Sequence, residues 1–543
     1  MVTRWKDEIF LDGHNLTVED VILVARGSKG EYPTVRLHPS KRDKLSLIRK
    51  EIEKLLLTDV MYGVNTGAGS NRDRIVPLNK LLGYQRGYTL SHCCGSGLHL
   101  KKDVVRAMML LRVNSFMVGY SGVTVELCDK ILELLNNDIV PVIPEHGSLG
   151  ASGDLSPLAH LAAVLIGYTE TRVMVNGEIR PTRDVLKERN ICFLKLQPKE
   201  AMAVTNGATM MLAYSCLAVH DAVELLRIAN IAAALNMEAI RGEMDALDMR
   251  IHLARNQVGQ REVAEDMNAL LKNSKRVTRE AQNVCFVHED KKDCIESCTQ
   301  RRVQDAYSTR CVPQAHGAVF DAIWYLREKV ENEICAATDN PLIFRNEDGT
   351  YSALSGGNFH GDPLAIPLDT LAIALTKLAV ISDRRFFRVI NSQYSHGLPQ
   401  NLSVTEDHSS GFMIPQYSAG SDALRCGMLS MPASVFNVVT SGMQEDYVSN
   451  GANAAWKCRL IIEFVRDALA KELLAQCQAI DLGKERLKPM GLDLLGEGTA
   501  PAHRFIRDRI GMMKQDGYFT ADFEEIRKTL ENGSMLRAVE DKE

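Results

Sequence analysis

The sequence has no uninterrupted apolar segment of about 18 residues, the length that a membrane-spanning helix needs. The nearest approach is residues 365–381, AIPLDTLAIALTKLAVI, which Asp369 and Lys377 interrupt. The first residues, MVTRWKDEIFLDG, also lack the apolar region of a secretory signal. These two absences predict a cytoplasmic protein without a membrane partner.

An excess of positive charge is missing too. The chain has 64 Lys and Arg residues against 69 Asp and Glu residues, a net charge of −5. Such a balance leaves no broad basic surface, so nucleic acid is not an expected partner. Internal repeats and Gly/Ser-rich linkers are not visible either.

The 13 cysteines form no evident framework, because they are scattered and odd in number. We expect mostly buried, free thiols in a reducing compartment. A metal-binding or scaffold protein built on Cys285, Cys294 and Cys298 is an alternative. Their C-x8-C-x3-C spacing matches no familiar zinc pattern, however, so we expect no metal site.

Long stretches of the chain have helical periodicity. Residues 100–137 read as an amphipathic helix that breaks near Gly119. Other stretches exceed about 20 residues and are apolar around much of the helix; they are 208–240, 314–336, 361–390 and 451–480. Such helices are best buried at the centre of a bundle that is shared between subunits.

Strand signals are short, and a hairpin over residues 172–181 is the clearest of them. The fold class is therefore predicted to be mainly α. Residues 1–200 would form a mixed N-terminal region that carries the glycine-rich loops. Residues 201–480 would form the central long-helix bundle, and residues 481–543 a C-terminal helical tail.

The segment at residues 147–154, GSLGASGD, carries unusual chemistry. Gly153 has no Cβ, so its amide nitrogen can approach the Ala151 carbonyl carbon in a sharp turn. Ring closure, with loss of water from that carbon and from the Ser152 side chain, would leave an imidazolone with an exocyclic methylene. That methylene is an electrophile, whereas ordinary side chains act as nucleophiles, acids and bases. Taken as a tripeptide alone, Ala-Ser-Gly would be only a loop before a helix.

The longer segment GSLGASGDLSPLAHLA resembles the prosthetic-group loop of the aromatic amino-acid ammonia-lyase and aminomutase family. That family forms 4-methylideneimidazole-5-one (MIO) from Ala-Ser-Gly. Further blocks resemble the family in the same order along the chain: YGVNTG at 62–67, NG at 206–207, QDAYSTRC at 304–311, DNPL at 339–342, GGNFHG at 356–361 and QED at 444–446. The resemblance implies a MIO group that forms autocatalytically from Ala151, Ser152 and Gly153, with no external cofactor.

The resemblance also implies roles for single residues. Tyr62 would take the β-proton of an amino-acid substrate, which requires a lowered pKa because a phenol is a poor base at pH 7. Arg310 would hold the substrate carboxylate through paired hydrogen bonds. Asn206 and the catalytic Tyr307 would lie near the carboxylate, the amine or the MIO group. Other substrate-lining residues would be Gln304, Asn340 and Phe359. Family members are homotetramers whose sites combine residues of several subunits, so a homotetramer is expected.

Two positions bear on the choice of substrate. The pair Ser91-His92 is similar to the histidine ammonia-lyase branch, although some tyrosine aminomutases share it. Gln444 and Glu445 put a carboxylate where many tyrosine- and phenylalanine-directed members have asparagine. A carboxylate beside a histidine suits the N–H groups of an imidazole, whereas a bare phenyl ring would leave the charge unpartnered.

These positions predict elimination of ammonia from L-histidine to give urocanate. The alternatives are a 2,3-aminomutase, which returns the ammonia to the β-carbon, and a lyase acting on tyrosine or another amino acid. Some residues depart from the family pattern. Ala68 opens space in the tyrosine loop, and Ala306 replaces a proline that is common in the histidine branch. Asp422 and Arg425 either pair with each other on one helix, or Asp422 brings charge toward the substrate.

Overall fold

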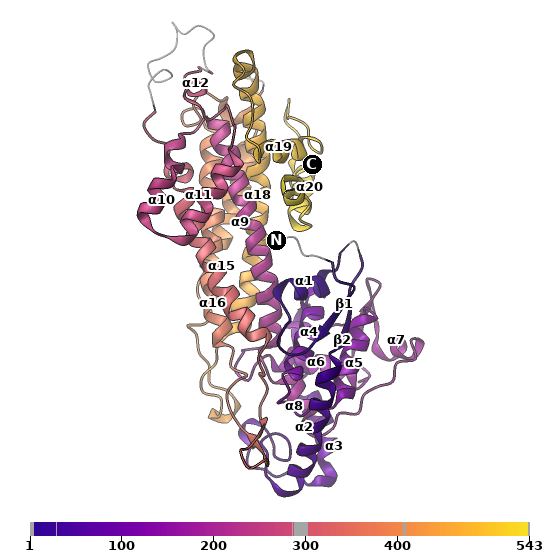
Figure 1. The fold of residues 1–543 in the computed structure, drawn as a ribbon. Helices are drawn as coiled ribbons and strands as arrows, with labels where there is room; N and C mark the ends of the chain where they lie inside the picture. The colour runs from indigo at the N-terminus through magenta and orange to yellow at the C-terminus, as the bar shows by residue number, and fades with distance from the viewer. Residues whose placement is uncertain (1–4, 29, 285, 287–301, 405–408, 541–543) are drawn as a thin grey trace. The chain divides into compact units, whose positions relative to one another are not determined.

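The computed structural model describes residues 5–28, 30–284, 286, 302–404 and 409–540 (Figure 1). The chain divides into two compact units. The first unit combines Met1–His220, Tyr325–Asp369 and Pro432–Trp456, and the second combines Asp221–Trp324, Thr370–Met431 and Lys457–Glu543. The three regions predicted from the sequence follow chain order, and this division stays a prediction. They are residues 1–200, 201–480 and 481–543.

All the named strands belong to the first unit and are short. β1 (Glu8–Leu11) pairs in parallel with β2 (Thr34–Leu37), and β3 (Ser96–His99) pairs antiparallel with β5 (Pro144–His146). β4 (Val140–Pro141), β6 (Arg172–Val175) and β7 (Glu178–Pro181) form a three-stranded antiparallel sheet, and β8 (Leu342–Arg345) pairs with β9 (Tyr351–Leu354). The β6–β7 pair confirms the hairpin predicted over residues 172–181.

Among the described residues, eight α-helices lie wholly within the first unit. They are α1 (Val18–Arg26), α2 (Pro39–Thr58), α3 (Leu81–His92), α4 (Lys102–Met117), α5 (Val125–Asn136), α6 (Leu155–Leu165), α7 (Thr182–Glu188) and α8 (Glu200–Thr205). The predicted break near Gly119 is confirmed, because α4 ends at Met117 and α5 begins at Val125. α4 is buried around most of its circumference, including its two arginines, Arg106 and Arg112.

The four long helices predicted from the sequence are confirmed. They are α9 (Thr209–Ile240), α15 (Val312–Ile334), α16 (Asp362–Val389) and α18 (Gly451–Leu487). The boundary between the two units falls within each of these helices.

Shorter helices of the second unit are α10 (Met249–Arg255), α11 (Val258–Leu270), α12 (Arg279–Gln282), α14 (Tyr307–Arg310), α17 (Met413–Leu429), α19 (Thr499–Arg507), α20 (Phe519–Glu531) and α21 (Ser534–Glu540). Single 3-10 turns are η1 (Gly69–Asn71), η2 (Leu78–Lys80), η3 (Met244–Leu247), η4 (Gln400–Leu402), η5 (Ser441–Met443) and η6 (Lys488–Met490).

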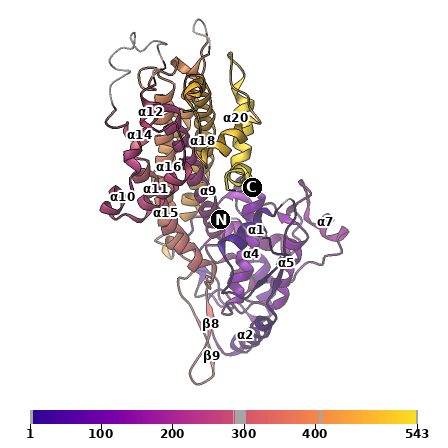
Figure 2. The ribbon, with the colours of Figure 1, turned by 45° about the horizontal axis from the view of Figure 1, so that its top comes forward.

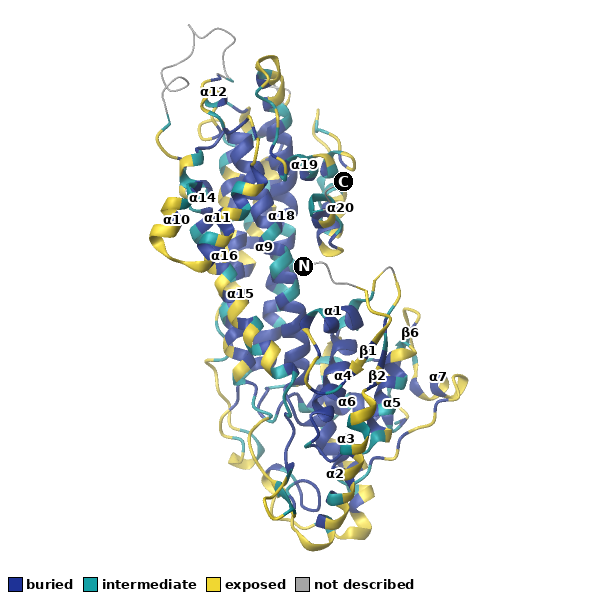
Figure 3. Ribbon diagram, in the orientation of Figure 1, coloured by how far each residue is buried: buried dark blue, intermediate teal, exposed yellow. Residues whose placement is uncertain are grey.

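In the second unit, the long helices run side by side as a bundle (Figures 1 and 2). Their facing residues are buried, and Figure 3 shows the same burial along the ribbons. Polar pairs also join them. Arg385 on α16 donates from two nitrogens to Glu472 on α18 at 2.5 and 2.9 Å, and both side chains are fully buried. This bidentate geometry is what lets a buried ion pair offset its loss of hydration.

Two of these helices, α9 and α16, are long and apolar enough to span a membrane by length and composition alone. The apolar windows that meet this criterion are 83% and 61% buried inside the structure, respectively. Neither helix is an uninterrupted apolar run, because α9 carries Asp221, Glu224 and Arg227, and α16 carries Asp369 and Lys377. Burial gives these apolar side chains protein partners, as in the core helix of a bundle.

Candidate active site

A pocket of about 450 Å³ lies in the first unit. Five of the site residues predicted from the sequence line it: Tyr62, His92, Ser152, Asn206 and Glu445. The remaining lining residues are Gly67, Ala68, Gly69, Asn71, Arg74, Ile75, Val76, Tyr84, Gly87, Tyr88, Ser91, Leu155, Met202 and Ser441. Segments that are hundreds of residues apart in the sequence thus meet around one cavity.

The Tyr62 loop forms one wall of the pocket. The phenolic oxygen of Tyr62 accepts a hydrogen bond from the backbone N–H of Gly69 at 2.9 Å. The next residue, Ser70, donates its backbone N–H to the Ser441 hydroxyl at 3.1 Å. These bonds fix the phenol against the start of η1 and tie the loop to the segment that carries Glu445.

The pKa of Tyr62 is raised, whereas a general base needs a lowered pKa. Burial, as the main cause, raises the pKa of Tyr62, and the negative charge of Glu445 raises it further. The Gly69 N–H and the positive charge of Arg72 act in the opposite direction but do not outweigh these effects. The expectation of a lowered pKa is therefore not met within one chain, and the phenol stays protonated at neutral pH.

The Ala151-Ser152-Gly153 loop lies flat against the Asn206-Gly207 segment. Gly153 and Gly207 pair in a parallel β-bridge, and the Asp154 N–H donates to the Gly207 carbonyl oxygen at 2.9 Å. Gly153 has a φ of +78°, and a Cβ there would overlap the backbone of Gly207. Only glycine permits both the positive φ and the close approach, so the loop needs Gly153 for its shape.

Buried polar groups anchor the same loop on its other side. The fully buried carboxylate of Asp154 accepts hydrogen bonds from the Ser148 hydroxyl at 2.8 Å and from the Met211 N–H at 3.0 Å. Burial raises the pKa of Asp154 to about 6, and these hydrogen bonds partly offset that rise. The Ser449 hydroxyl adds a bond to the Gly150 carbonyl oxygen at 2.9 Å.

The Asn206 side chain contacts the loop directly. Its amide nitrogen donates to the Ser152 carbonyl oxygen at 2.9 Å. Its own oxygen is buried and has no hydrogen-bond partner among the residues that the structure describes. In a MIO ring, the Ser152 carbonyl would be conjugated with the methylene, so a donor on this oxygen would draw electrons away from the methylene. The tight turn at Gly153 and this donor both fit the MIO group.

His92 and Glu445 lie at another part of the pocket wall. The Nδ1 atom of His92 lies 2.7 Å from the Tyr88 carbonyl oxygen, and the His92 and Tyr88 rings are in contact, with centroids 4.0 Å apart and ring planes tilted by 31°. Burial lowers the pKa of His92, so the ring is neutral at neutral pH. Since a carbonyl only accepts, Nδ1 carries the proton and Nε2 remains an acceptor.

Sequence reasoning missed two tyrosines that line the pocket. Tyr84 and Tyr88 precede His92 on α3 at intervals of four residues, which places all three on one face of the helix. Burial raises the pKa of Tyr84 to about 12 and that of Tyr88 still higher, so both stay neutral. The four-residue spacing was the signal that would have found them. Arg74 and Met202 also line the pocket without any comparable signal.

Besides Ala151 and Gly153, which flank Ser152 in the loop, three predicted residues of the first unit do not line the pocket. Gln444 is exposed beside Glu445. Asn340 is buried and braces its own loop, donating to the Ser355 hydroxyl at 3.0 Å and accepting the Gly356 N–H at 2.7 Å. Phe359 is half-buried. Their roles at the substrate stay predictions.

Gln304, Tyr307 and Arg310 belong to the second unit and do not line the pocket either. The Tyr307 side chain is 72% exposed, and Gln304 is also exposed. The Arg310 guanidinium lies over the Tyr307 ring at 4.5 Å and donates from Nε to the Asp305 carbonyl oxygen at 2.8 Å. Tyr307 and Gln304 are thus exposed, whereas Arg310 is half-buried beside the Tyr307 ring.

The residues that depart from the family pattern separate into two cases. Ala68 lines the pocket, so the space that it opens belongs to the site. Asp422, by contrast, pairs with Lys471 on α18, and Arg425 lies over the Phe464 ring at 5.3 Å. The expected pairing of Asp422 with Arg425 is replaced by these contacts, and neither residue lines the pocket.

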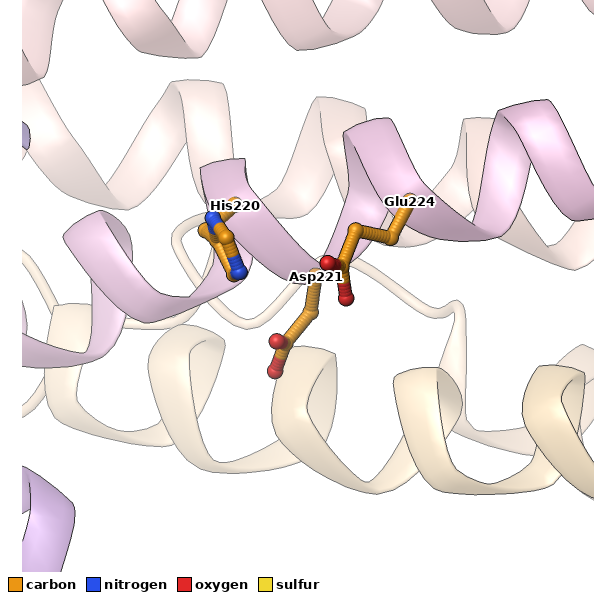
Figure 4. Close-up of side chains that lie close together, drawn as sticks. All are labelled: His220, Asp221 and Glu224. Carbon is orange, nitrogen blue, oxygen red and sulfur yellow. The ribbon is translucent and has the colours of Figure 1, made fainter. Parts of the chain in front are cut away.

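The thiols and one acidic group bear on metal binding. The ten cysteines within the described residues are free, and Cys285, Cys294 and Cys298 lie outside those residues. Figure 4 shows His220, Asp221 and Glu224 on α9, whose potential ligand atoms lie within 4.8 Å of one another. Asp221 accepts a hydrogen bond from Arg459 at 2.6 Å, so its charge is balanced within the helical bundle.

Comparisons with known proteins identify the family of the chain. The family model for aromatic amino acid lyases matches residues 16–508, and the chain belongs to that family. It is 39% identical to a histidine ammonia-lyase from Alkaliphilus oremlandii over 98% of both chains. Among solved structures, a tyrosine aminomutase from Streptomyces globisporus matches with a TM-score of 0.88 and 33% identity over 99% of both chains. A histidine ammonia-lyase from Trypanosoma cruzi matches with a TM-score of 0.85 and 32% identity over 98% of this chain and 95% of that one.

Proposed function

We propose that this protein is a MIO-dependent ammonia-lyase that converts L-histidine to urocanate and ammonia. The observation that carries the proposal is that His92 and Glu445 share one pocket with Tyr62 and Ser152. A substrate in this pocket would meet the reactive loop and, at its ring, an acceptor nitrogen and a carboxylate. Two acceptors suit the N–H of an imidazole better than they suit a phenyl ring.

Each pocket residue of this chain has its own role in the proposed reaction. When present, the MIO group supplies an electrophile for the substrate amine, which makes ammonia a better leaving group. Asn206 donates to the Ser152 carbonyl and so stabilises negative charge on that oxygen. Tyr62 takes the β-proton. His92 and Glu445 orient the ring and bring the β-carbon toward Tyr62.

A second copy of the chain would complete the site. We infer that Tyr307 and Arg310, which do not line the pocket of their own chain, serve the pocket of a partner in a homotetramer. A cation such as the partner's Arg310 would hold the substrate carboxylate and would also lower the pKa of Tyr62. Exposed apolar side chains on α17 and after it support assembly; they include Ile414, Tyr417, Leu424, Met428, Met431, Val435, Phe436 and Met443. The free cysteines of the described residues favour the cytoplasm as the compartment, because reducing conditions there keep thiols from forming disulfides.

An aminomutase is the second candidate, and the likeness to tyrosine aminomutase structures favours it. Both reactions use the same pocket residues. They differ in whether ammonia leaves the site or returns to the β-carbon of the same substrate.

A substrate panel tests the proposal. Purified enzyme would be incubated with L-histidine, L-tyrosine and L-phenylalanine. The ultraviolet absorbance of the conjugated product and the release of ammonium would be followed together. Urocanate and ammonium in equal amounts from L-histidine are the expected result. A β-amino acid without free ammonium would identify an aminomutase, and turnover of tyrosine alone would overturn the assignment of substrate.

A further inference from the structure

Arg112 is a charged residue in an unusual place. It lies near the middle of α4, and its side chain is fully buried. The described residues offer it no carboxylate within ion-pair distance, and its hydrogen bonds all go to neutral oxygens. Burying a guanidinium without an ion-pair partner is costly, so the hydrogen bonds that Arg112 makes must offset that cost.

The hydrogen bonds of Arg112 converge on the segment that touches the Ala-Ser-Gly loop. Nη1 donates to the Asn206 carbonyl oxygen at 2.8 Å and to the Thr209 hydroxyl at 3.2 Å. Nη2 contacts the Ser115 hydroxyl and lies 3.3 Å from the Thr338 hydroxyl. The guanidinium therefore clamps the start of α9 and the residue before Gly207.

Arg112, Gly207 and Gly153 are stacked without free space. A Cβ on Gly207 would overlap Arg112 Nη1 and would come within 2.7 Å of the Thr338 hydroxyl. A Cβ on Gly153 would overlap the backbone of Gly207 on the other side. A shift of the guanidinium is thus transmitted through one peptide to the residue whose nitrogen must attack the Ala151 carbonyl carbon.

We infer that Arg112 is a positioning residue for the formation of the prosthetic group, acting through Asn206 and Gly207 on the Ala151-Ser152-Gly153 loop. This inference rests on the proposed function, because it assumes that the loop becomes MIO. It assigns Arg112 to the maturation of the site, because Arg112 does not line the pocket.

The reaction that Arg112 would assist balances without an oxidant. A bond forms between Gly153 N and the Ala151 carbonyl carbon, and the proton of Gly153 N moves to the Ala151 oxygen. That oxygen leaves as water with the Ser152 amide proton, which gives a C=N bond. The Ser152 hydroxyl then leaves as water with the proton of its own Cα, which gives the methylene. Two waters are lost in all, and each chain becomes lighter by their mass.

Arg106 provides a matched control on the same helix. It is also buried, and it donates to the carbonyl oxygens of Val24 and Leu135 and to the Asp138 carboxylate. Its partners do not touch the Ala-Ser-Gly loop. Arg106→Lys and Arg112→Lys therefore both perturb a buried arginine of α4, but only Arg112→Lys should affect the loop.

The test is mass spectrometry of the loop peptide from folded, full-length chains that gel filtration has separated from aggregates. Wild-type and Arg106→Lys chains should lack two waters. Folded Arg112→Lys chains should mostly retain both waters, and cyclisation followed during cell-free synthesis should be at least about tenfold slower, as expected for the loss of one charged hydrogen bond. Folded Arg112→Lys chains that lose two waters like the wild type would overturn the inference. If the wild-type chain itself keeps both waters, the proposed function fails instead.

A second variant covers the case in which Arg112→Lys does not fold. Ser115→Ala leaves the guanidinium in place and removes one of its anchors. Slower loss of the two waters than in the wild type would support the inference. Loss of both waters at the wild-type rate would overturn it.

Discussion

The side-chain amide of Asn206 donates to the Ser152 carbonyl oxygen, with the nitrogen and oxygen 2.9 Å apart. The two residues are far apart in the sequence, yet this bond joins Asn206, for which we propose a role at the substrate, to the Ala151-Ser152-Gly153 loop. The carbonyl that accepts it would share electrons with the methylene of a MIO group. The bond is therefore placed to act on the chemistry as well as on the fold.

Replacing Asn206 with Asp tests this role. The carboxylate has nearly the same shape but cannot donate, so the Ser152 oxygen loses its partner and faces a negative charge. We expect kcat for L-histidine to fall on the order of 10²-fold to 10³-fold, the cost of one preorganised donor. The loop should still lose two waters, because the backbone carbonyl that Arg112 holds is unchanged. Asn346→Asp, on an exposed loop, is the control, and an unchanged kcat in Asn206→Asp would contradict the role.

Ser152→Ala tests the electrophile itself. Without the Ser152 hydroxyl the methylene cannot form, so turnover should fall by on the order of 10³-fold or more. The fold should persist, with the midpoint of thermal unfolding within about 4 °C of the wild type. Ser156→Ala is a matched control, since the buried Ser156 hydroxyl has no hydrogen-bond partner among the described residues. If Ser152→Ala and Ser156→Ala both kept the activity of the wild type, a MIO mechanism would be ruled out.

Glu445→Gln tests the choice of substrate. If the carboxylate accepts an N–H from the imidazole, its loss should lower kcat/KM for L-histidine by about 10- to 100-fold, the value of a charged hydrogen bond. Any turnover of L-tyrosine or L-phenylalanine should change far less. Steady-state kinetics with the three substrates would measure the difference, with Asp446→Asn at the exposed neighbouring position as the control. Equal losses for all substrates would argue against contact between Glu445 and the ring.

Helical periodicity was sufficient to predict the long helices, because their apolar positions repeat along continuous stretches of chain. It could not predict which segments meet. The pocket joins the Tyr62 loop, α3, the Ser152 loop and the segment at Glu445, and only the family motifs linked them in advance. Tyr84 and Tyr88 were within reach of a helical-spacing argument, since they share a face with His92.

Other features depend on packing that no local pattern encodes. The Arg112 guanidinium is fully buried, although a charged residue in an amphipathic helix is ordinarily expected at the surface. The raised pKa of Tyr62 depends on burial and on Glu445, which is distant in the sequence. The pairing of Asp422 with Lys471 likewise required the position of α18.

The pH dependence of turnover follows from the position of Tyr62. Burial and the Glu445 charge raise its pKa, so only a small fraction of the phenol is ionised at neutral pH. As long as the pH stays below this pKa, each rise of one pH unit increases the ionised fraction about tenfold. Replacing Glu445 with Gln removes the negative charge and lowers this pKa. The rising limb of kcat/KM against pH, measured with one substrate, should therefore move to lower pH in Glu445→Gln. Asp446→Asn should leave the limb in place, and an unmoved limb in Glu445→Gln would mean that another group sets it.

The composition of the complete site can be tested with two inactive variants. Tyr62 lines the pocket of the first unit, whereas Arg310 belongs to the second unit and does not line the pocket. If Arg310 serves the pocket of a partner chain, Tyr62→Phe and Arg310→Met each inactivate the sites of their own homo-oligomer. Co-expression of the two variants would produce mixed oligomers in which some pockets combine an intact Tyr62 with an intact Arg310 from another chain. Activity should then reappear, while a mixture of the two separately assembled proteins stays inactive. No recovery in verified mixed oligomers would mean that both residues must come from the same chain.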